Sequence, residues 1–210
     1  MEYITLKNSV CEEFIEKRSR FLGYAAPVTS EQEALDFIEA IRAKHRDATH
    51  NVYAYRVREG NLCRYSDDGE PSGTAGMPVL SVLTKGDIID AAIVVTRYFG
   101  GILLGGGGLV RAYSHSAAIA VSAAVPVTMR ECAICQAVCD YSTYGRMASL
   151  IPEEGAVLDD TEFTDAVKLR FHIDKNLLDA FCARVTDVTC GTVTVESFST
   201  MFFPFEKSDT

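Results

Sequence analysis

The chain has 210 residues, of which 48% are apolar, and a formal charge of −9 from 20 basic and 29 acidic residues. This length allows one large or two small domains with their own cores, and the apolar content excludes a disordered chain. The acidic balance disfavours non-specific binding of RNA, which needs a basic surface, although a local basic patch on the first part of the chain stays compatible with it.

The start of the chain and its apolar stretches indicate where the protein resides. Met1 is followed at once by Glu2 and mixed polar sequence, without the basic and apolar regions of a signal peptide. The longest apolar stretches, around Ala91–Val95 and Ala117–Val127, are too short or too broken to cross a bilayer. We therefore expect a cytoplasmic protein without a membrane partner.

The first part of the chain carries both strand and helix patterns. Val10–Val28 is typical of a β-hairpin, and Ser30 followed by Glu33 is a capping box that opens a helix running to about Lys44. The later predicted elements of this part are a strand at Asn51–Val57, a polar loop at Tyr65–Pro78, a short element at Val79–Leu83, a buried strand at Ala91–Phe99 and a helix at Leu109–Ala124.

A domain boundary is predicted after Pro126, which ends that helix. Up to Pro126 there are 13 basic and 15 acidic residues, whereas the remainder has 7 and 14. We therefore predict domains at 1–126 and 127–206. The second has a strand to about Cys139, helices at Ser142–Pro152 and Lys175–Cys190, and strands near Ala156–Leu158, Ala166–Ile173 and Thr192–Phe198. This order of elements is the ferredoxin-like plan.

A glycine-rich stretch between the buried strand and the following helix is the first candidate site. It runs from Arg97 and Tyr98 through Gly100, Gly101 and four glycines at 105–108 to Arg111. A loop of this kind exposes backbone N–H groups beside the positive end of a helix dipole, which suits an anion such as phosphate. The spacing matches neither the Walker pattern nor the dinucleotide fingerprint. The alternative is a tight turn that only needs positive φ angles.

An acidic loop is the second candidate site. Asp67, Asp68 and Glu70 lie within four residues and could bind a hard cation or position a substrate amine. The spacing is not that of a calcium loop, and a solvated, self-capped turn is the alternative.

Histidines and cysteines give weaker signals. Only His50, beside the strand that carries Arg56, is a candidate, and no Ser-His-Asp or Cys-His arrangement is evident. Cys132, Cys135 and Cys139 have a spacing compatible with zinc or an iron–sulfur cluster. In a strand, however, Cys132 would face away from the other two, so we predict no metal and no cofactor.

Three groups of residues together resemble the YigZ/IMPACT family of bacterial two-domain proteins. The matching residues are Thr49-His50-Asn51 with Ala54-Tyr55-Arg56, then Asp68-Gly69-Glu70-Pro71 with Gly73-Thr74-Ala75-Gly76 and Pro78, and finally Arg97-Tyr98-Phe99-Gly100-Gly101 with Leu104-Gly105 and Gly108-Leu109-Val110-Arg111-Ala112-Tyr113. These motifs cover the first domain in order and form a specific composite signature.

The resemblance implies an α+β protein. Its N-terminal domain would be like the second domain of ribosomal protein S5, and its C-terminal ferredoxin-like domain would resemble the C-terminal modules of elongation factor G. Eukaryotic relatives are tied to translational control through partner proteins. The resemblance therefore implies a non-enzymatic regulator that binds the translation machinery or its regulatory proteins.

We predict one binding site that combines the glycine stretch, the acidic loop and the strand of His50, without catalytic residues. Its proposed members are His50, Tyr55, Arg56, Asp67, Asp68, Glu70, Thr74, Arg97, Tyr98, Gly100, Gly101, Gly105, Gly108 and Arg111. The rival hypothesis is an enzyme or sensor for a phosphorylated small molecule at the glycines, with the carboxylates placed for magnesium or base chemistry.

Overall fold

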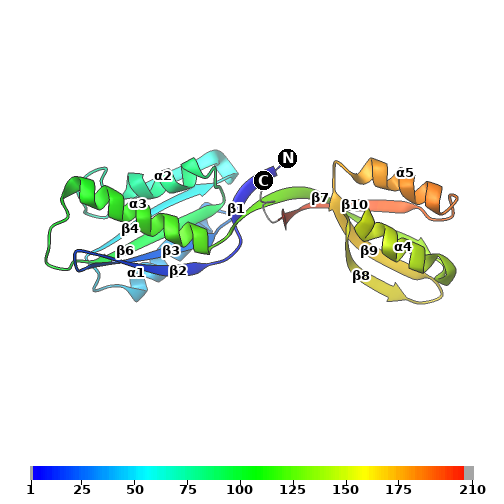
Figure 1. Cartoon of the computed structure of the whole chain (residues 1–210), viewed down its shortest axis with the longest axis horizontal. Helices are drawn as coiled ribbons and strands as arrows, with labels where there is room; N and C mark the ends of the chain where they lie inside the picture. The colour runs from blue at the N-terminus through cyan, green and yellow to red at the C-terminus, as the bar shows by residue number, and fades with distance from the viewer. Residues whose placement is uncertain (1, 206–210) are drawn as a thin grey trace. The chain divides into compact units, whose positions relative to one another are not determined.

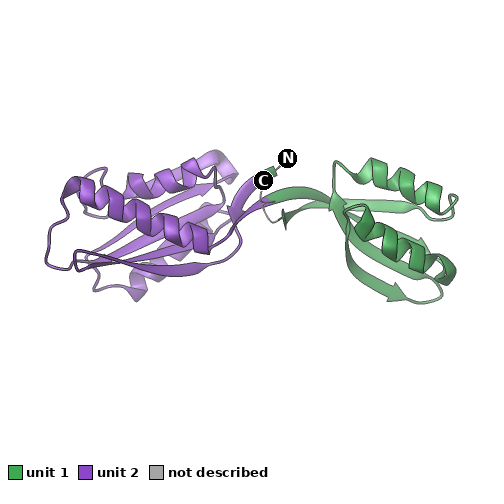
Figure 2. Cartoon of the chain, in the orientation of Figure 1, with its two compact units in different colours: residues 1–2, 129–205 green, residues 3–128, 206–210 purple. Residues whose placement is uncertain are grey.

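A computed structural model describes residues 2–205 and divides the chain into two compact units. We call Tyr3–Thr128 the N-terminal unit and Met129–Phe205 the C-terminal unit (Figure 2). Each combines helices with a sheet whose neighbouring strands run antiparallel where their register is defined, so the protein is α+β. The sequence predicts a boundary after Pro126, and the structure divides the chain after Thr128.

The N-terminal unit is built on a sheet of strand order β2-β3-β6-β4-β5. These strands are β2 (Val10–Glu16), β3 (Ser19–Pro27), β6 (Ala91–Tyr98), β4 (His50–Val57) and β5 (Leu62–Ser66). A further strand near the start of the chain, β1 (Glu2–Leu6), is not part of this sheet. As its continuous apolar run predicts, β6 is buried and central, with β3 and β4 as its neighbours. Because side chains alternate between the two faces of a strand, β6 contributes residues to two separate cores, one on each face of the sheet.

Helices cover both faces of this sheet (Figure 1). On one face, α1 (Glu31–Lys44) packs Ala34, Ile38 and Ile41 against the sheet. On the other face, α2 (Gly76–Lys85) and α3 (Gly105–Ala123) enclose a second core with residues such as Val95. The predicted capping box is present, because Ser30 accepts a hydrogen bond from the Glu33 backbone N–H.

The structure differs from the predicted elements in two places. The strands β1 and β5 are absent from the prediction. For β5, the reason is that Leu62–Ser66 is short, largely exposed and lacks a regular apolar alternation. The four glycines at 105–108, predicted as a loop, form the first turn of α3. The connection between β6 and α3 is therefore the segment Phe99–Leu104.

The C-terminal unit has the predicted strand–helix–strand–strand–helix–strand order. Its elements are β7 (Pro126–Cys139, which starts before the unit boundary), α4 (Tyr141–Glu153), β8 (Val157–Phe163), β9 (Val167–Asp174), α5 (Leu178–Val188) and β10 (Val195–Phe205). In the sheet β7 lies between β9 and β10, and β8 pairs with β9. Met147, Ile151 and Phe181 of the two helices pack against inward-facing residues of β7 and β9.

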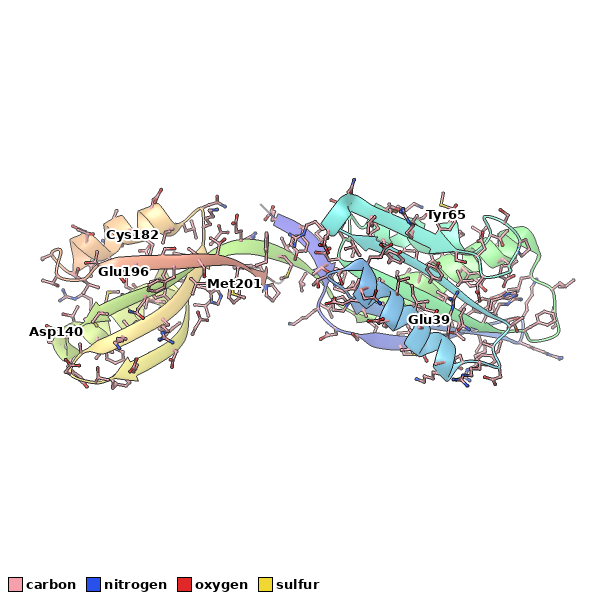
Figure 3. The ribbon with its side chains drawn as sticks, turned by 180° about the vertical axis from the view of Figure 1, so that it is seen from behind. Glu39, Tyr65, Asp140, Cys182, Glu196 and Met201 are labelled. Carbon is pink, nitrogen blue, oxygen red and sulfur yellow. The ribbon has the colours of Figure 1, made fainter. Side chains whose placement is uncertain are left out.

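The cysteines of β7 behave as small buried side chains. Cys135 and Cys139 belong to the core under the helices, and Cys132 is buried three residues earlier in the strand. Burial, with the charge of Asp174, raises the pKa of Cys132 to about 11, which favours the neutral thiol over a metal-binding thiolate. Cys182 lies on α5 (Figure 3). Within residues 2–205, no three His, Cys, Asp or Glu side chains are placed to hold a metal ion.

In the part of the chain that the structure describes, every helix is too short or too polar to cross a bilayer.

Candidate functional site

A pocket of about 410 Å³ opens in the N-terminal unit beside the start of α3. Leucine, phenylalanine, proline and glycine form most of its wall, so we call it the apolar pocket. Its lining residues are Thr49, His50, Glu70, Pro71, Arg97, Phe99, Leu103, Leu104, Gly105, Gly106 and Leu109. They come from the start of β4 and the residue before it, the loop after β5, the end of β6, the segment Phe99–Leu104 and the start of α3. The pocket therefore unites the segments that the sequence motifs singled out.

A buried ion pair forms the floor of this pocket. The Arg97 guanidinium donates from Nη1 to Oε1 of Glu70 over 2.5 Å, and both side chains are at least nine-tenths buried. The Tyr113 hydroxyl donates to the same carboxylate oxygen over 2.7 Å. Burial, with the charge of Glu70, raises the pKa of Tyr113 above its ordinary value, so the hydroxyl keeps its proton and remains a donor.

His50 completes the polar end of the pocket. Its Nδ1 lies 2.7 Å from the backbone carbonyl of Asp68, and a carbonyl oxygen can only accept, so Nδ1 carries a proton. In the neutral ring, Nε2 then holds the lone pair, 3.7 Å from Oε1 of Glu70. The fixed tautomer leaves Nε2 able to accept a hydrogen bond from a bound group.

The acidic loop is held by its own carboxylates. The side chain of Asp67 accepts hydrogen bonds from the backbone N–H groups of Gly73, Ala75 and Gly76, the last of which opens α2. Asp68 accepts from the Asn51 backbone over 2.6 Å and pairs with Arg42. Both carboxylates therefore shape the loop that carries Glu70.

Thr74 also has a local role. Its hydroxyl donates to the Pro71 carbonyl over 2.6 Å, which closes a turn in the same loop. The predicted self-capped turn is thus present in the loop, with Glu70 as the carboxylate that lines the pocket.

Replacement of Asp67 tests this structural role. We expect Asp67→Asn to lower the free energy of unfolding by about 1–2 kcal/mol, because the amide replaces an ionised acceptor of three N–H groups. Burial opposes the charged form of Asp67, but the three backbone hydrogen bonds outweigh it and lower the pKa. Because the pKa of Asp67 is lower in the folded than in the unfolded chain, its carboxylate stabilises the fold at pH values above the unfolded-state pKa. This stabilisation is lost as the pH falls through the folded-state pKa. Chemical unfolding at pH 7 and pH 3 should show the difference between the two proteins shrinking at the lower pH.

Three of the four glycines at the start of α3 are not required by packing, whereas a Cβ added at Gly108 would lie 3.0 Å from the Cβ of Leu104. A Cβ added at Gly106 or Gly107 would meet its nearest atom at 3.9 or 3.8 Å, and one at Gly105 would meet nothing within 4 Å. Gly105 has a φ of +69°, which favours glycine, whereas the other two incur the usual cost of glycine in a helix. Their bare backbone therefore leaves room for a group from outside the chain.

Gly100 and Gly101 have different roles from the glycines of α3. Gly100 packs directly on the backbone of Arg18 and Ser19, and its N–H donates to the Ser19 hydroxyl over 3.2 Å. Gly101 has a φ of +80° and open space around its Cα. These two glycines shape the segment between β6 and α3.

Three predicted site residues lie away from the apolar pocket. Tyr55 and Tyr98 face α1 on the opposite side of the sheet, where Tyr55 donates to Glu31 and Tyr98 contacts His45. Arg56 lies at the far end of β4, about 20 Å from His50 by strand geometry, and its guanidinium donates to the Ile88 carbonyl. The predicted site is therefore divided by the sheet and by the length of β4.

Gly108 and Arg111 lie on α3 but line a neighbouring cavity instead of the apolar pocket. Conversely, two residues that hold the pocket floor were outside the predicted set. They are Tyr113, one turn after Leu109 on the buried face of α3, and Ser19, whose hydroxyl contacts Arg97. The helical spacing of Leu109, Ala112 and Tyr113 is a signal that could have placed Tyr113 beside the pocket.

Comparison with known proteins covers both units. The family described as the Impact N-terminal domain matches residues 17–121, a range that contains every residue lining the apolar pocket. The IMPACT family member YvyE of Bacillus subtilis is 37% identical over 190 residues, which are 90% of this chain and 88% of that protein.

The chain belongs to the IMPACT family. A second IMPACT family member, YigZ of Escherichia coli, is 32% identical over 84% of this chain and 88% of its own length. Residues 138–192 match the family described as Domain of unknown function (DUF1949). The eukaryotic relative Protein IMPACT-A of Xenopus tropicalis is 36% identical over 100 residues, 45% of this chain and 31% of that protein.

A solved structure described as that of a hypothetical protein also resembles this chain. It is 28% identical, with a TM-score of 0.60, and the match covers 94% of this chain and 98% of the other. The similarity to IMPACT-family bacterial proteins therefore extends over both units, whereas the eukaryotic match is confined to about half of the chain.

Proposed function

We propose that this IMPACT-family chain is a non-enzymatic regulator linked to translation, which binds a ribosomal or regulatory protein surface through the N-terminal unit. The observation that carries the proposal is the segment Phe99–Leu104 at the mouth of the apolar pocket. There Leu103 is 83% exposed, and Phe99 and Ile102 are 46% and 40% exposed. We call these three side chains the apolar rim. Exposed apolar side chains gathered beside a pocket are typical of a protein-binding surface.

The polar residues at the floor of the pocket support a role in binding a partner over a role in catalysis. Oε1 of Glu70 already accepts from Arg97 and Tyr113, so the charge of Glu70 is neutralised inside the chain. A partner side chain entering the pocket would meet a largely apolar wall with His50 Nε2 as an acceptor at its end. This combination suits an apolar anchor residue that carries a hydrogen-bond donor, such as Trp or Tyr.

The link to translation is supported by the fold likenesses that the family resemblance implies. We propose that the N-terminal unit is like the second domain of ribosomal protein S5. For the C-terminal unit, the strand order β10-β7-β9-β8 supports a ferredoxin-like fold resembling the C-terminal modules of elongation factor G. The proposal places the protein in the cytoplasm, where its partner would be found. The net charge of −9 favours a protein surface over RNA as that partner.

Co-sedimentation with ribosomes at low salt tests this function. We expect the intact chain to be retained in ribosome-containing fractions and Leu103→Asp to reduce retention by at least about tenfold, because a buried charge replaces an interface anchor. Leu35→Asp is the matched control: it introduces the same charge at a side chain of α1 that is 40% exposed, and it should be retained like the unaltered chain.

Two results would contradict the proposal. One is absence of the intact chain from ribosome-containing fractions at every salt concentration used. The other is equal loss of retention in Leu103→Asp and Leu35→Asp, which would show that charge at the surface, and not the apolar rim, governs the association.

A further inference from the structure

A second cavity of about 380 Å³ lies next to the apolar pocket, and Leu104 lines both. Basic side chains from the β2–β3 turn and from α3 converge on it, so we call it the basic pocket. Its lining residues are Phe14, Glu16, Lys17, Leu104, Gly108, Arg111, Ala112 and His115. The proposed binding of a macromolecular partner to the apolar rim makes no use of these basic groups.

The two permanent cations of the basic pocket have no carboxylate partner. Lys17 and Arg111 form no ion pair with any residue in the described range 2–205, a property that they share with other surface cations such as Arg46 and Arg64. What distinguishes Lys17 and Arg111 is that both line the same cavity. Two exposed cations that face one cavity repel each other, and an anion between them would relieve that repulsion.

The backbone at Lys17 supports the same conclusion. Lys17 and Arg18 are the two central residues of the hairpin turn between Glu16 and Ser19, with φ angles of 45° and 67°. A two-residue turn with both φ angles positive favours Asn and Gly, and other residues there lose stability. The turn geometry favours neither Lys17 nor Arg18, and of the two only Lys17 lines the basic pocket, where its ammonium group can act.

The remaining wall defines the kind of ligand. Phe14 and Leu104 supply apolar surface, and the His115 ring packs edge-on against the Phe14 ring at 4.6 Å between centroids. A cavity of this size accommodates a small molecule. A long polyanion would extend beyond the cavity and be repelled by the net negative charge of the chain, which favours a small ligand.

We propose that the basic pocket binds a small phosphorylated molecule. Its phosphate oxygens pair with Lys17 and Arg111, His115 donates a further hydrogen bond, and the organic part packs against Phe14 and Leu104. Arg111 gives two parallel hydrogen bonds to phosphate, and Lys17 acts as a point charge. Glu16 also lines the cavity, so the phosphate groups are expected on the side of Lys17 and Arg111.

An NMR titration of the ¹⁵N-labelled full chain tests the proposal, with inorganic pyrophosphate and ATP as probes. We expect both probes to shift the amide signals of Lys17, Gly108 and Arg111. Lys17→Asn and Arg111→Gln should each weaken pyrophosphate binding about tenfold, because each removes a charge-assisted contact. Lys17 and Arg111 are exposed, so both variants should fold.

The turn provides a matched control. Arg18→Gly removes an adjacent positive charge that does not line the pocket, and it should bind pyrophosphate within about twofold of the unaltered chain while melting at a higher temperature. Lys17→Asn should also keep or raise the melting temperature. Loss of binding without loss of stability separates a ligand contact from a structural one.

Three outcomes would overturn the proposal: no shift with either probe, binding by Lys17→Asn and Arg111→Gln equal to that of the unaltered chain, or tighter and steeply salt-dependent binding of single-stranded RNA at the same residues. The site is independent of the proposed function. Leu103→Asp should retain pyrophosphate binding even where ribosome retention is lost, so failure of one proposal leaves the other standing.

Discussion

Replacement of Arg97 by Met is expected to lower the free energy of unfolding by about 3–5 kcal/mol. The substitution leaves the Glu70 carboxylate in the floor of the apolar pocket, where its side chain is 4% exposed, without its cationic partner. Tyr113 and His50 remain nearby, but neither carries a permanent positive charge. Urea unfolding followed by circular dichroism at pH 7 measures the effect.

Two variants show whether burial is the cause. Arg42→Met breaks a pair with Asp68 in which both side chains are about one-third exposed, and it should cost at most about 1 kcal/mol. The double variant Arg97→Met with Glu70→Met removes both charges and should recover most of the lost stability. The prediction is wrong if Arg97→Met lowers the free energy of unfolding by less than about 1 kcal/mol, or if the double variant recovers none of the loss. Either result would show that the buried charge of Glu70 does not need Arg97 for its compensation.

The same ion pair connects three elements that are distant in sequence. Arg97 is the penultimate residue of β6, Glu70 lies in the loop after β5, and Tyr113 lies on α3. Because all three meet at one carboxylate oxygen, the loop that walls the pocket and the helix that opens it are fixed to the same point of the sheet. This arrangement explains why a pocket with an apolar wall has charged residues at its floor.

Most of the fold could be predicted because local signals agree with the tertiary arrangement. The capping box at Ser30, the continuous apolar run of β6 and the break at Pro126 each mark an element that the structure contains. The exposed strand Leu62–Ser66 could not be predicted in this way, because its stability comes from pairing with β4 and not from an apolar face of its own.

The predicted site residues come from segments that meet at the apolar pocket, but the structure does not bring all of these residues together. Arg97 and Tyr98 are adjacent in a strand, so their side chains must point to opposite faces, and only one of them can reach a given site. Which face holds the site depends on where α1 and α3 pack, and that packing is not encoded in the motifs themselves. The helical spacing of Leu109, Ala112 and Tyr113 puts Tyr113 on the buried face of α3, but its hydrogen bond to Glu70 depends on where that helix packs.

The unpredicted basic pocket has a similar explanation. Lys17 lies in a hairpin turn and Arg111 on a helix that follows almost a hundred residues later. No spacing rule connects such positions, because the sheet order places β2 beside β3 and α3 packs over both. The glycine-rich stretch therefore contributes to two cavities, one largely apolar and one basic, where the sequence predicted a single anion site.

Gly100 is the glycine of this stretch whose replacement should have the largest effect. A Cβ at this position would lie within 3.0 Å of the backbone of Arg18 and Ser19, and backbone atoms cannot move aside as a flexible side chain can. We expect Gly100→Ala to cost at least about 3 kcal/mol, because the β2–β3 turn must separate from the end of β6. Thermal unfolding monitored by circular dichroism measures the loss.

Gly106→Ala is the matched control for Gly100→Ala, since the same methyl group would be added where the nearest atom is 3.9 Å away. It should leave stability unchanged or raise it by up to about 1 kcal/mol, because alanine favours the helical turn that glycine weakens. Equal melting temperatures for Gly100→Ala and the unaltered chain would show that the turn does not pack on Gly100. A large loss of stability in Gly100→Ala together with no loss in Gly106→Ala would give the two kinds of glycine different roles. Gly100 then holds the segment Phe99–Leu104 in place, whereas the glycines of α3 leave the start of that helix open to a partner.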